Sequence, residues 1–324
     1  MYATQTDMDS KAFPGGSMDR FARLGAANSG AQANANRIGS GMPIRIYVLG
    51  RFSVAIDGQP ACVNGNGKSN GKAKQRPLAL LKALIAFGGR GVAPSQLCES
   101  LWPDSEGDLG IRNLTVTLHR LRHLLRAHAA VLQHAGKLTL NERVCWVDVW
   151  SFERWVNDGL RRLDEPAGGD AAELHLRAAL SLYSGHFLSC ESEESWMLTP
   201  RLRLKTKFER LVAALSKHLE SRQRFADAVD LCLQALERDP LNELIYRRLM
   251  SCYLKVGELA SVLRTYMRCR EALANEFSSP PSIETENIYL ESVRAATELS
   301  GAQAARQSHP SRVDRRTAMK RSLG

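Results

Sequence analysis

Residues 112–126, RNLTVTLHRLRHLLR, mix leucines and basic residues at helical spacing. Leu114, Leu118, Leu121 and Leu125 lie four, three and four positions apart, which is typical of the buried stripe of an amphipathic helix. At about 100° per residue, the opposite face carries Arg112, Val116, His119, Arg120, His123 and Arg126. The pattern predicts a helix over about 109–126 with a basic outward face. Whether that face binds a ligand or is only solvated depends on its surroundings.

Short strands are predicted on both sides of this helix. Alternating apolar residues over 44–61, interrupted by the turn IDGQP, predict a small antiparallel sheet. The segment VLQHAGKLTL (131–140) predicts a β-hairpin that turns at Ala135-Gly136.

Two further helices are predicted between the sheet and the basic helix. After a polar, glycine-rich loop over 64–76, one helix is expected to begin at about Pro77, whose fixed φ suits a first turn, and to stop at Gly88. Its inward side chains are expected to be Leu78, Leu81, Leu84 and Ile85. A shorter helix in VAPSQLCESLWPD ends before Pro103. The order of sheet, three helices and hairpin is that of a winged helix, whose third helix fills the DNA major groove.

The second half of the chain is predicted to be helical and repetitive. Residues 221–273 repeat with a period of 34, so that Phe225 aligns with Leu259. Ala228 and Ala235 fall at the small-residue positions of a tetratricopeptide repeat (TPR), whereas the second copy has larger residues there. Helix pairs of this kind stack into a continuous core with a groove for partners.

The charge distribution favours a binding role for the basic face. The formal net charge is +10 at pH 7. From Lys68 to Lys137 there are eleven Lys or Arg residues and four acidic ones, so most of the excess surrounds the basic helix. Such a concentration is the footprint expected of a surface that meets phosphates. We therefore expect double-stranded promoter DNA as a partner of this half.

Composition also sets expectations for the location and for the two ends. No apolar run approaches the roughly 20 residues of a membrane span, and the N-terminus lacks the features of a signal peptide. We therefore expect a cytoplasmic, nucleoid-associated protein with no membrane partner. The seven scattered cysteines contain no CxxC pair and indicate reduced thiols. Residues 1–43 are expected to form a disordered N-terminal tail, and 299–324 a basic disordered tail.

Several motifs resemble a known combination of domains. LGRFSVAIDG, RPLALLKALIAFGGRGVAPSQLCESLWPD and NLTVTLHRLRHLL resemble the winged-helix DNA-binding domain of the OmpR type. KLTLNERVCWVDVWSFE resembles the exit segment found when this domain precedes a bacterial transcriptional activator domain, BTAD. The BTAD pattern itself is resembled by SLYSGHFL, ESWMLTPRLRL and ERDPLNELIYRRLM. Together they resemble the SARP family of activators. The resemblance implies a mainly α fold, with an α+β OmpR-type winged helix at 44–150 followed by an all-α TPR-like helical repeat domain at 151–298.

The resemblance and the outward face together indicate candidate DNA contacts. Arg120 is predicted to bind guanine O6 and N7 through two hydrogen bonds. Val116 either covers a thymine methyl group or packs against a neighbouring helix. Lys137, beside the hairpin tip, is expected to reach a phosphate or the minor groove. Positions that match those used by OmpR-type domains for bases or phosphates are Arg112, Asn113, Thr115, Thr117, His119 and Arg122.

The segment WPDSEGDLG (102–110) joins the second and third helices. The resemblance implies that this loop contacts RNA polymerase, which makes Asp104, Glu106 and Asp108 the candidate polymerase-contact residues. The alternative is that these acids are solvated loop charges that favour the N-terminus of the following helix.

The motifs favour no enzyme, no cofactor and no metal. GNGKS (65–69) lacks the first glycine of a phosphate-binding loop because Cys62 occupies that position. His119 and His123 lack a third zinc ligand. We therefore predict a sequence-specific DNA-binding transcription activator whose helical domain serves partner or self interaction, through a homo-oligomer or an effector. The alternative is a TPR scaffold whose basic domain binds acidic partners nonspecifically.

Overall fold

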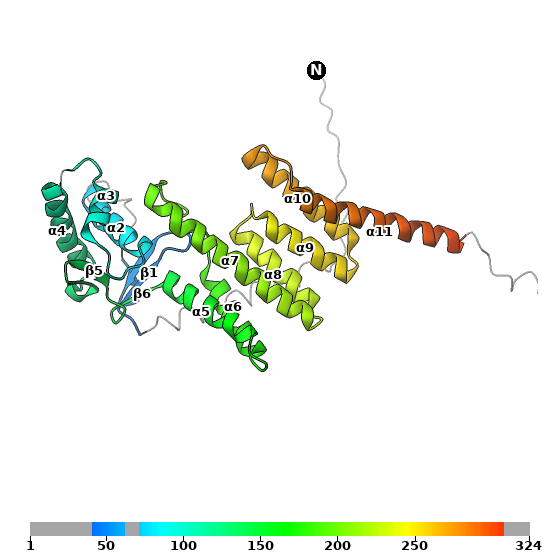
Figure 1. The fold of residues 1–324 in the computed structure, drawn as a ribbon, viewed down its shortest axis with the longest axis horizontal. Helices are drawn as coiled ribbons and strands as arrows, with labels where there is room; N and C mark the ends of the chain where they lie inside the picture. The colour runs from blue at the N-terminus through cyan, green and yellow to red at the C-terminus, as the bar shows by residue number, and fades with distance from the viewer. Residues whose placement is uncertain (1–40, 62–70, 106, 308–324) are drawn as a thin grey trace, which may run out of the picture.

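The computed structural model describes residues 41–61, 71–105 and 107–307. Its first half contains β1 (Ile44–Tyr47), β2 (Ser53–Ile56), β3 (Gln59–Pro60), α2 (Gly71–Ala86), α3 (Pro94–Leu101), α4 (Gly107–Leu124), η1 (His128–Ala130), β4 (Val131–His134), β5 (Lys137–Leu140) and β6 (Cys145–Val147). The described residues follow the order of sheet, helices and hairpin that was predicted for a winged helix. Figure 1 shows this half at one end of the molecule, with the helical half extending away from it.

The N-terminal sheet is larger than predicted. β1 and β2 pair antiparallel as expected, with Ile44 opposite Ile56 and Ile46 opposite Val54. The described strands are ordered β3-β2-β1-β6, and the unpredicted β6 pairs parallel with the free edge of β1. Because β6 follows the hairpin in sequence, this pairing closes the two ends of the winged helix onto each other.

The N-terminus of α2 differs from its prediction. The helix begins at Gly71, so Pro77 lies inside it and the loop expected over 64–76 is partly helical. A proline inside a helix lacks one backbone donor. Arg76 beside it donates from Nη1 to the Leu101 carbonyl at 2.7 Å, which ties this turn to the end of α3. The inward residues are as predicted, because the structure buries Leu78, Leu81, Leu84 and Ile85.

The wing, which we define as β4 and β5, is the predicted hairpin. Its turn residues Ala135 and Gly136 have φ values of 48° and 74°, and two positive φ values are typical of a two-residue hairpin turn. Leu138 of β5 exchanges two backbone hydrogen bonds with Val92, which lies between α2 and α3. The wing is therefore fixed to the helical layer along one strand, while Leu132, Gln133 and His134 of β4 are exposed.

The second half is a stack of helices. They are α5 (Asp148–Leu163), α6 (Gly169–Leu182), α7 (Ser195–Ser221), α8 (Phe225–Arg238), α9 (Glu243–Val256), α10 (Leu259–Phe277) and α11 (Ile283–Gln307). α8 and α10 begin at Phe225 and Leu259, which is the predicted 34-residue offset. α9 packs against both of them, and Ala228 and Ala235 are fully buried. The TPR-like part of the predicted fold class is confirmed.

The ends of the predicted domains differ from the helices observed. α11 continues to Gln307, whereas a disordered tail was expected from 299. The boundary expected at 150–151 falls inside α5. The remaining parts of the two expected tails, 1–40 and 308–324, lie outside the described residues.

Backbone and side-chain hydrogen bonds join the two halves. Asp148, the first residue of α5, is buried, and its Oδ2 accepts from the N–H groups of Val48 at 2.8 Å and Leu49 at 2.9 Å. Leu49 forms a β-bridge with Phe187, which follows α6. The Leu188 N–H donates to the Val48 carbonyl at 2.8 Å. The segment after β1 is therefore held by the helical half on two sides.

The hydrophobic core also crosses this junction. One cluster of buried apolar side chains runs from Ile44 in β1 to Leu273 in α10. The winged helix therefore shares its core with the helical half, because β1 and α2 pack on the same cluster as α7 and α8. Binding and stability are best measured on the full chain.

Ala228→Leu with Ala235→Leu is expected to destabilise the whole chain. Both side chains are fully buried, and forcing extra methylenes into a packed core typically costs about 1–3 kcal/mol per site. Because the core is continuous, the melting temperature of the full chain should fall, as followed by circular dichroism. Ala226→Leu, at an exposed position of the same helix, is the matched control. An equal melting temperature in the double variant and the control would contradict this packing.

Candidate nucleic-acid interface

The apolar stripe of α4 holds this helix against α2 and α3. The exposed fractions of Leu114, Leu118, Leu121 and Leu125 are 5, 6, 0 and 0%, which confirms the predicted stripe. α4 begins at Gly107 rather than at 109, and Asp108 in its first turn suits the positive end of the helix dipole. Gly110 faces α3, and a Cβ there would lie 3.4 Å from the Cβ of Cys98. The two helices therefore pack closely at this position, with room for about one methyl group.

The face of α4 opposite the stripe is exposed and basic. Arg112, His119 and Arg120 are exposed, and none of the three forms an ion pair with any residue that the structure describes. Val116 is 50% exposed, so its side chain is not packed against a neighbouring helix. Figure 1 shows α4 at the outer edge of the winged helix, on the side away from α7 to α11. This face is therefore open to a large ligand.

Three other candidate contact residues differ in depth. Thr117 is only 6% exposed, because it lies on the buried side between Leu114 and Leu121. We therefore withdraw Thr117 as a contact, since its hydroxyl cannot reach a base or a phosphate. Asn113 is half-buried at the edge of the outward face, and Thr115 is exposed, with its hydroxyl donating to the Ile111 carbonyl at 2.9 Å.

Arg122 has a different role from the one predicted. Its Nε and Nη2 both donate to the carbonyl of Val131, at 3.1 and 2.7 Å. Val131 is the first residue of β4, so this guanidinium links the last turn of α4 to the base of the wing. A side chain held in this way positions the wing and has little freedom to follow a phosphate.

Arg122→Ala is expected to loosen the wing. The substitution removes two hydrogen bonds from a charged donor, each typically worth about 1.5–3 kcal/mol, and leaves the buried Val131 without this partner. Hydrogen exchange of the β4 and β5 amides should become faster. Arg126→Ala, at an exposed position just after α4, should leave these rates unchanged. Unaltered exchange in Arg122→Ala would show that the wing is held by its backbone bonds alone.

The wing adds two exposed side chains near α4. Lys137 begins β5 opposite His134, and both are exposed. His134 was not predicted, although its place next to the hairpin turn was a usable signal. Arg90 lies near the wing but forms an ion pair with Glu142, so its charge is already compensated. Lys137 is therefore the wing residue best suited to a phosphate.

The candidate polymerase-contact loop is only partly described. Asp104 is exposed between α3 and α4, and Asp108 is exposed in the first turn of α4. Glu106 lies outside the described residues. Two acids of this loop thus face solvent at the N-terminal end of α4.

Metal ligands, thiols and membrane-spanning segments are the other features to place in the described part of the chain. No group of three His, Cys, Asp or Glu side chains there is arranged to hold a metal ion. The six cysteines that the structure describes are free thiols. The GNGKS segment lies outside the described residues. No helix of the described part is both long and apolar enough to cross a membrane.

Comparison with protein families identifies the helical half. A model of the bacterial transcriptional activator domain matches residues 147–291, from the end of β6 into α11. Residues 147–291 are therefore similar to a bacterial transcriptional activator domain. This match bears out the BTAD part of the resemblance that the sequence motifs indicated. The BTAD family is one of transcriptional regulators rather than enzymes.

Solved structures share the fold at low sequence identity. Mycobacterium tuberculosis EmbR, solved in complex with a low-affinity phosphopeptide, is 18% identical with a TM-score of 0.55. The likeness covers 78% of this chain, which is more than the BTAD span, and 65% of EmbR. Two further structures are more distant. The Hsp90 co-chaperone Cns1 from Saccharomyces cerevisiae is 16% identical with a TM-score of 0.35, and the likeness covers 54% of this chain and 46% of Cns1. The TPR2B domain of yeast Sti1 is 18% identical with a TM-score of 0.28, and the likeness covers 45% of this chain and 98% of that domain. A comparison with curated protein sequences finds no match.

Proposed function

We propose that the chain is a sequence-specific DNA-binding transcription activator. The observation that carries this proposal is the outward face of α4, whose arginines are exposed and unpaired among the described residues while its other face is fixed in the core. The major groove of B-DNA, about 12 Å wide, admits an α-helix. In this arrangement Arg120 reads a guanine, Val116 covers a thymine methyl group, and Arg112 contacts a phosphate.

The proposal assigns separate tasks to the two halves of the chain. Residues 44–150 bind promoter DNA, with Lys137 of the wing reaching a phosphate beside the groove. The BTAD helices, proposed as 151–298 and observed to continue to Gln307, recruit partners, bind an effector or pair with a second copy. RNA polymerase is the partner expected at the loop before α4. A protein of this kind would work at the nucleoid.

A gel shift with the full chain tests the proposal. Labelled promoter fragments from the source genome are titrated with the protein, and heparin is then added as a competitor. Some fragments should stay bound at heparin concentrations that release the others, because base contacts add selectivity to the phosphate attraction that all fragments share. Equal release of all fragments would instead favour a scaffold whose basic half binds acidic partners without sequence preference.

Asp104→Ala with Glu106→Ala is expected to reduce transcription without reducing DNA affinity. The loop lies before α4, and Asp104 is exposed, so its charge is available to a protein already bound beside the promoter. Transcription in vitro with purified polymerase, at saturating promoter occupancy, measures the effect. Glu276→Ala, an exposed acid on α10, is the matched control. Undiminished transcription in the loop variant would show that these acids are solvated loop charges without a role in polymerase contact.

A further inference from the structure

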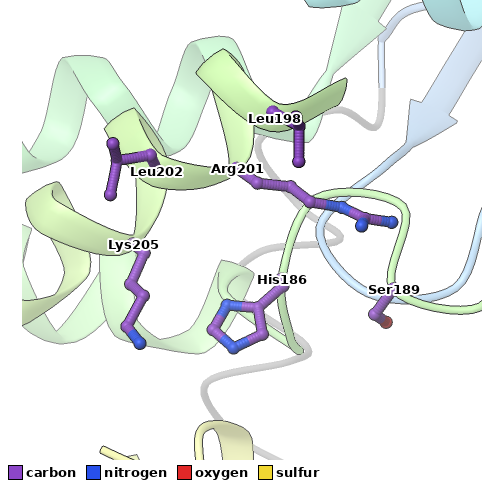
Figure 2. A pocket seen from close by; sticks show the side chains of 6 residues that line it. All are labelled: His186, Ser189, Leu198, Arg201, Leu202 and Lys205. Carbon is purple, nitrogen blue, oxygen red and sulfur yellow. The ribbon is translucent and has the colours of Figure 1, made fainter. Parts of the chain in front are cut away.

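A pocket lies in the BTAD half beside the junction with the winged helix. It has a cavity volume of about 370 Å³ and is lined by His186, Ser189, Leu198, Arg201, Leu202 and Lys205. Four of these residues come from the N-terminal part of α7, and the other two from the segment between α6 and α7. Figure 2 shows Lys205 and His186 reaching toward each other below α7, and Arg201 crossing to the segment that carries Ser189. The volume lies within the range of small-molecule sites.

The polar side of this pocket has two cationic groups, Arg201 and Lys205, whose present ion pairs are weak enough for an anion to replace. Lys205 Nζ is 3.9 Å from the carboxylate of the buried Asp239, at the outer limit of an ion pair, so its three donors are not saturated. Arg201 Nη1 pairs with Glu193, whose side chain is 66% exposed. Exposed pairs of this kind contribute little, so a bound anion can replace Glu193 at small cost.

The His186 side chain lines the pocket and is held in place by two polar contacts. Its Nε2 lies 3.3 Å from Asp239, and its Nδ1 lies 3.0 Å from the hydroxyl of Tyr183. Asp239 therefore keeps His186 and Asn242 as hydrogen-bond partners when Lys205 turns toward a ligand. Burial raises the pKa of Asp239, but the hydrogen bonds from His186 and Asn242 outweigh it and hold that pKa below its ordinary value. Asp239 therefore stays ionised, and an anion in the pocket competes with it for Lys205.

The other side of the pocket is apolar and exposed. Leu198 and Leu202 are 53 and 68% exposed and lie one turn apart on α7. Residues four apart on a helix are neighbours on one face, so the two leucines form a continuous apolar strip beside Arg201 and Lys205. A ligand that is apolar at one end and anionic at the other matches this arrangement of groups.

The pocket wall is also part of the junction between the two halves. Arg201 donates from Nε to the Phe187 carbonyl and from Nη2 to the Leu188 carbonyl, both at 2.9 Å. The same segment binds the winged helix, since the Gly50 N–H donates to the His186 carbonyl at 3.0 Å. A ligand that contacts Arg201 therefore contacts the side chain that holds the backbone of Phe187 and Leu188, next to the His186 carbonyl that accepts from Gly50.

We propose that this pocket binds a small organic anion, a carboxylate or phosphate monoester with a short apolar chain, and that the ligand stabilises the junction between the two halves. Arg201 and Lys205 take the anionic group, and Leu198 with Leu202 cover the apolar chain. The site does not depend on DNA recognition by α4, so its test needs no DNA.

The test is calorimetric titration of the full chain with octanoate and with octyl phosphate. 1-Octanol, which has the same chain without the charge, is the control ligand. We expect at least one anion to bind about tenfold more tightly than 1-octanol, and the tighter of the two identifies the anionic group. Lys205→Met, which keeps the apolar stem, should weaken that anion about tenfold. Lys217→Met, an exposed position farther along α7, should leave the affinity unchanged.

Hydrogen exchange measures the second part of the proposal. The tighter anion should slow exchange of the Gly50 and Leu188 amides, which donate across the junction. Anions that bind no better than 1-octanol, or equal affinities in Lys205→Met and Lys217→Met, would overturn the site. Unchanged exchange of the two amides in the saturated protein would overturn its effect on the junction.

Discussion

Replacing Asp148 by alanine should lower the free energy of unfolding of the full chain by about 3–5 kcal/mol, because three buried backbone donors lose their acceptor and each typically costs about 1–3 kcal/mol. The carboxylate is buried and accepts from three backbone N–H groups, those of Val48, Leu49 and Val149. Without it, these donors are left unpaired inside the core, and each unpaired buried donor is costly. The first two belong to the winged helix and the third to α5, so both halves should unfold together at lower denaturant.

Urea unfolding followed by circular dichroism measures this loss. Asp158→Ala is the matched control, because Asp158 is on the same helix but pairs only with the exposed Arg161. An exposed pair of this kind is worth about 0–1 kcal/mol, so the control should stay close to the parent. If Asp148→Ala lost no more than the control, the junction would not depend on this carboxylate.

Asp148 should also give the stability of the chain a pH dependence. Burial raises the pKa of its carboxyl from 3.8 to about 7, although hydrogen bonds from Leu49, Val48 and Val149 lower it. The folded chain therefore binds this proton more tightly than the unfolded chain. The resulting stabilisation is full below about pH 4 and is lost as the pH rises toward 7. Asp148→Asn does not titrate and should flatten the stability curve in this window; an unchanged slope would contradict the assignment.

Arg120→Ala should weaken binding to a preferred DNA site by about 1–3 kcal/mol and relax the preference at one base pair. The side chain is exposed near the middle of the outward face of α4, without an ion pair among the described residues. A guanidinium there can donate two hydrogen bonds to guanine, which phosphate attraction cannot replace. Competition titrations with the preferred site and its single-base variants measure the change.

Substitutions of two other arginines distinguish the loss of base recognition from the loss of positive charge. Arg112→Ala should weaken all sequences by nearly the same factor and reduce the salt slope by roughly one. Arg270→Ala removes the same charge from an exposed position on α10, far along the chain from α4, and should change neither affinity nor preference. An unchanged base preference in Arg120→Ala would show that this residue does not read the sequence.

Local periodicity explains which parts of the fold could be predicted. The leucine stripe of α4, the hairpin turn at Ala135-Gly136 and the 34-residue offset of α8 and α10 all depend on neighbours in sequence. The bacterial transcriptional activator domain was likewise visible in short motifs that the family match bears out. The exposed face of α4 followed directly from the spacing of its leucines.

The missed features depend on residues far apart in the chain. β6 pairs with β1 across most of the winged helix, and Asp148 bonds to Val48 from 100 residues away. The pattern of hydrophobic positions contains no sign of such pairings. Thr117 and Arg122 were misassigned for a related reason, because burial and the Val131 carbonyl decide what these side chains contact.

The central claim is that the exposed face of α4 reads a DNA sequence. Selection of genomic fragments by the full chain, followed by sequencing of the retained DNA, tests it most directly. The retained fragments should share a short motif with at least one guanine position that the Arg120→Ala variant no longer selects. Retained DNA without a shared motif, or the same motif selected by Arg120→Ala, would contradict it.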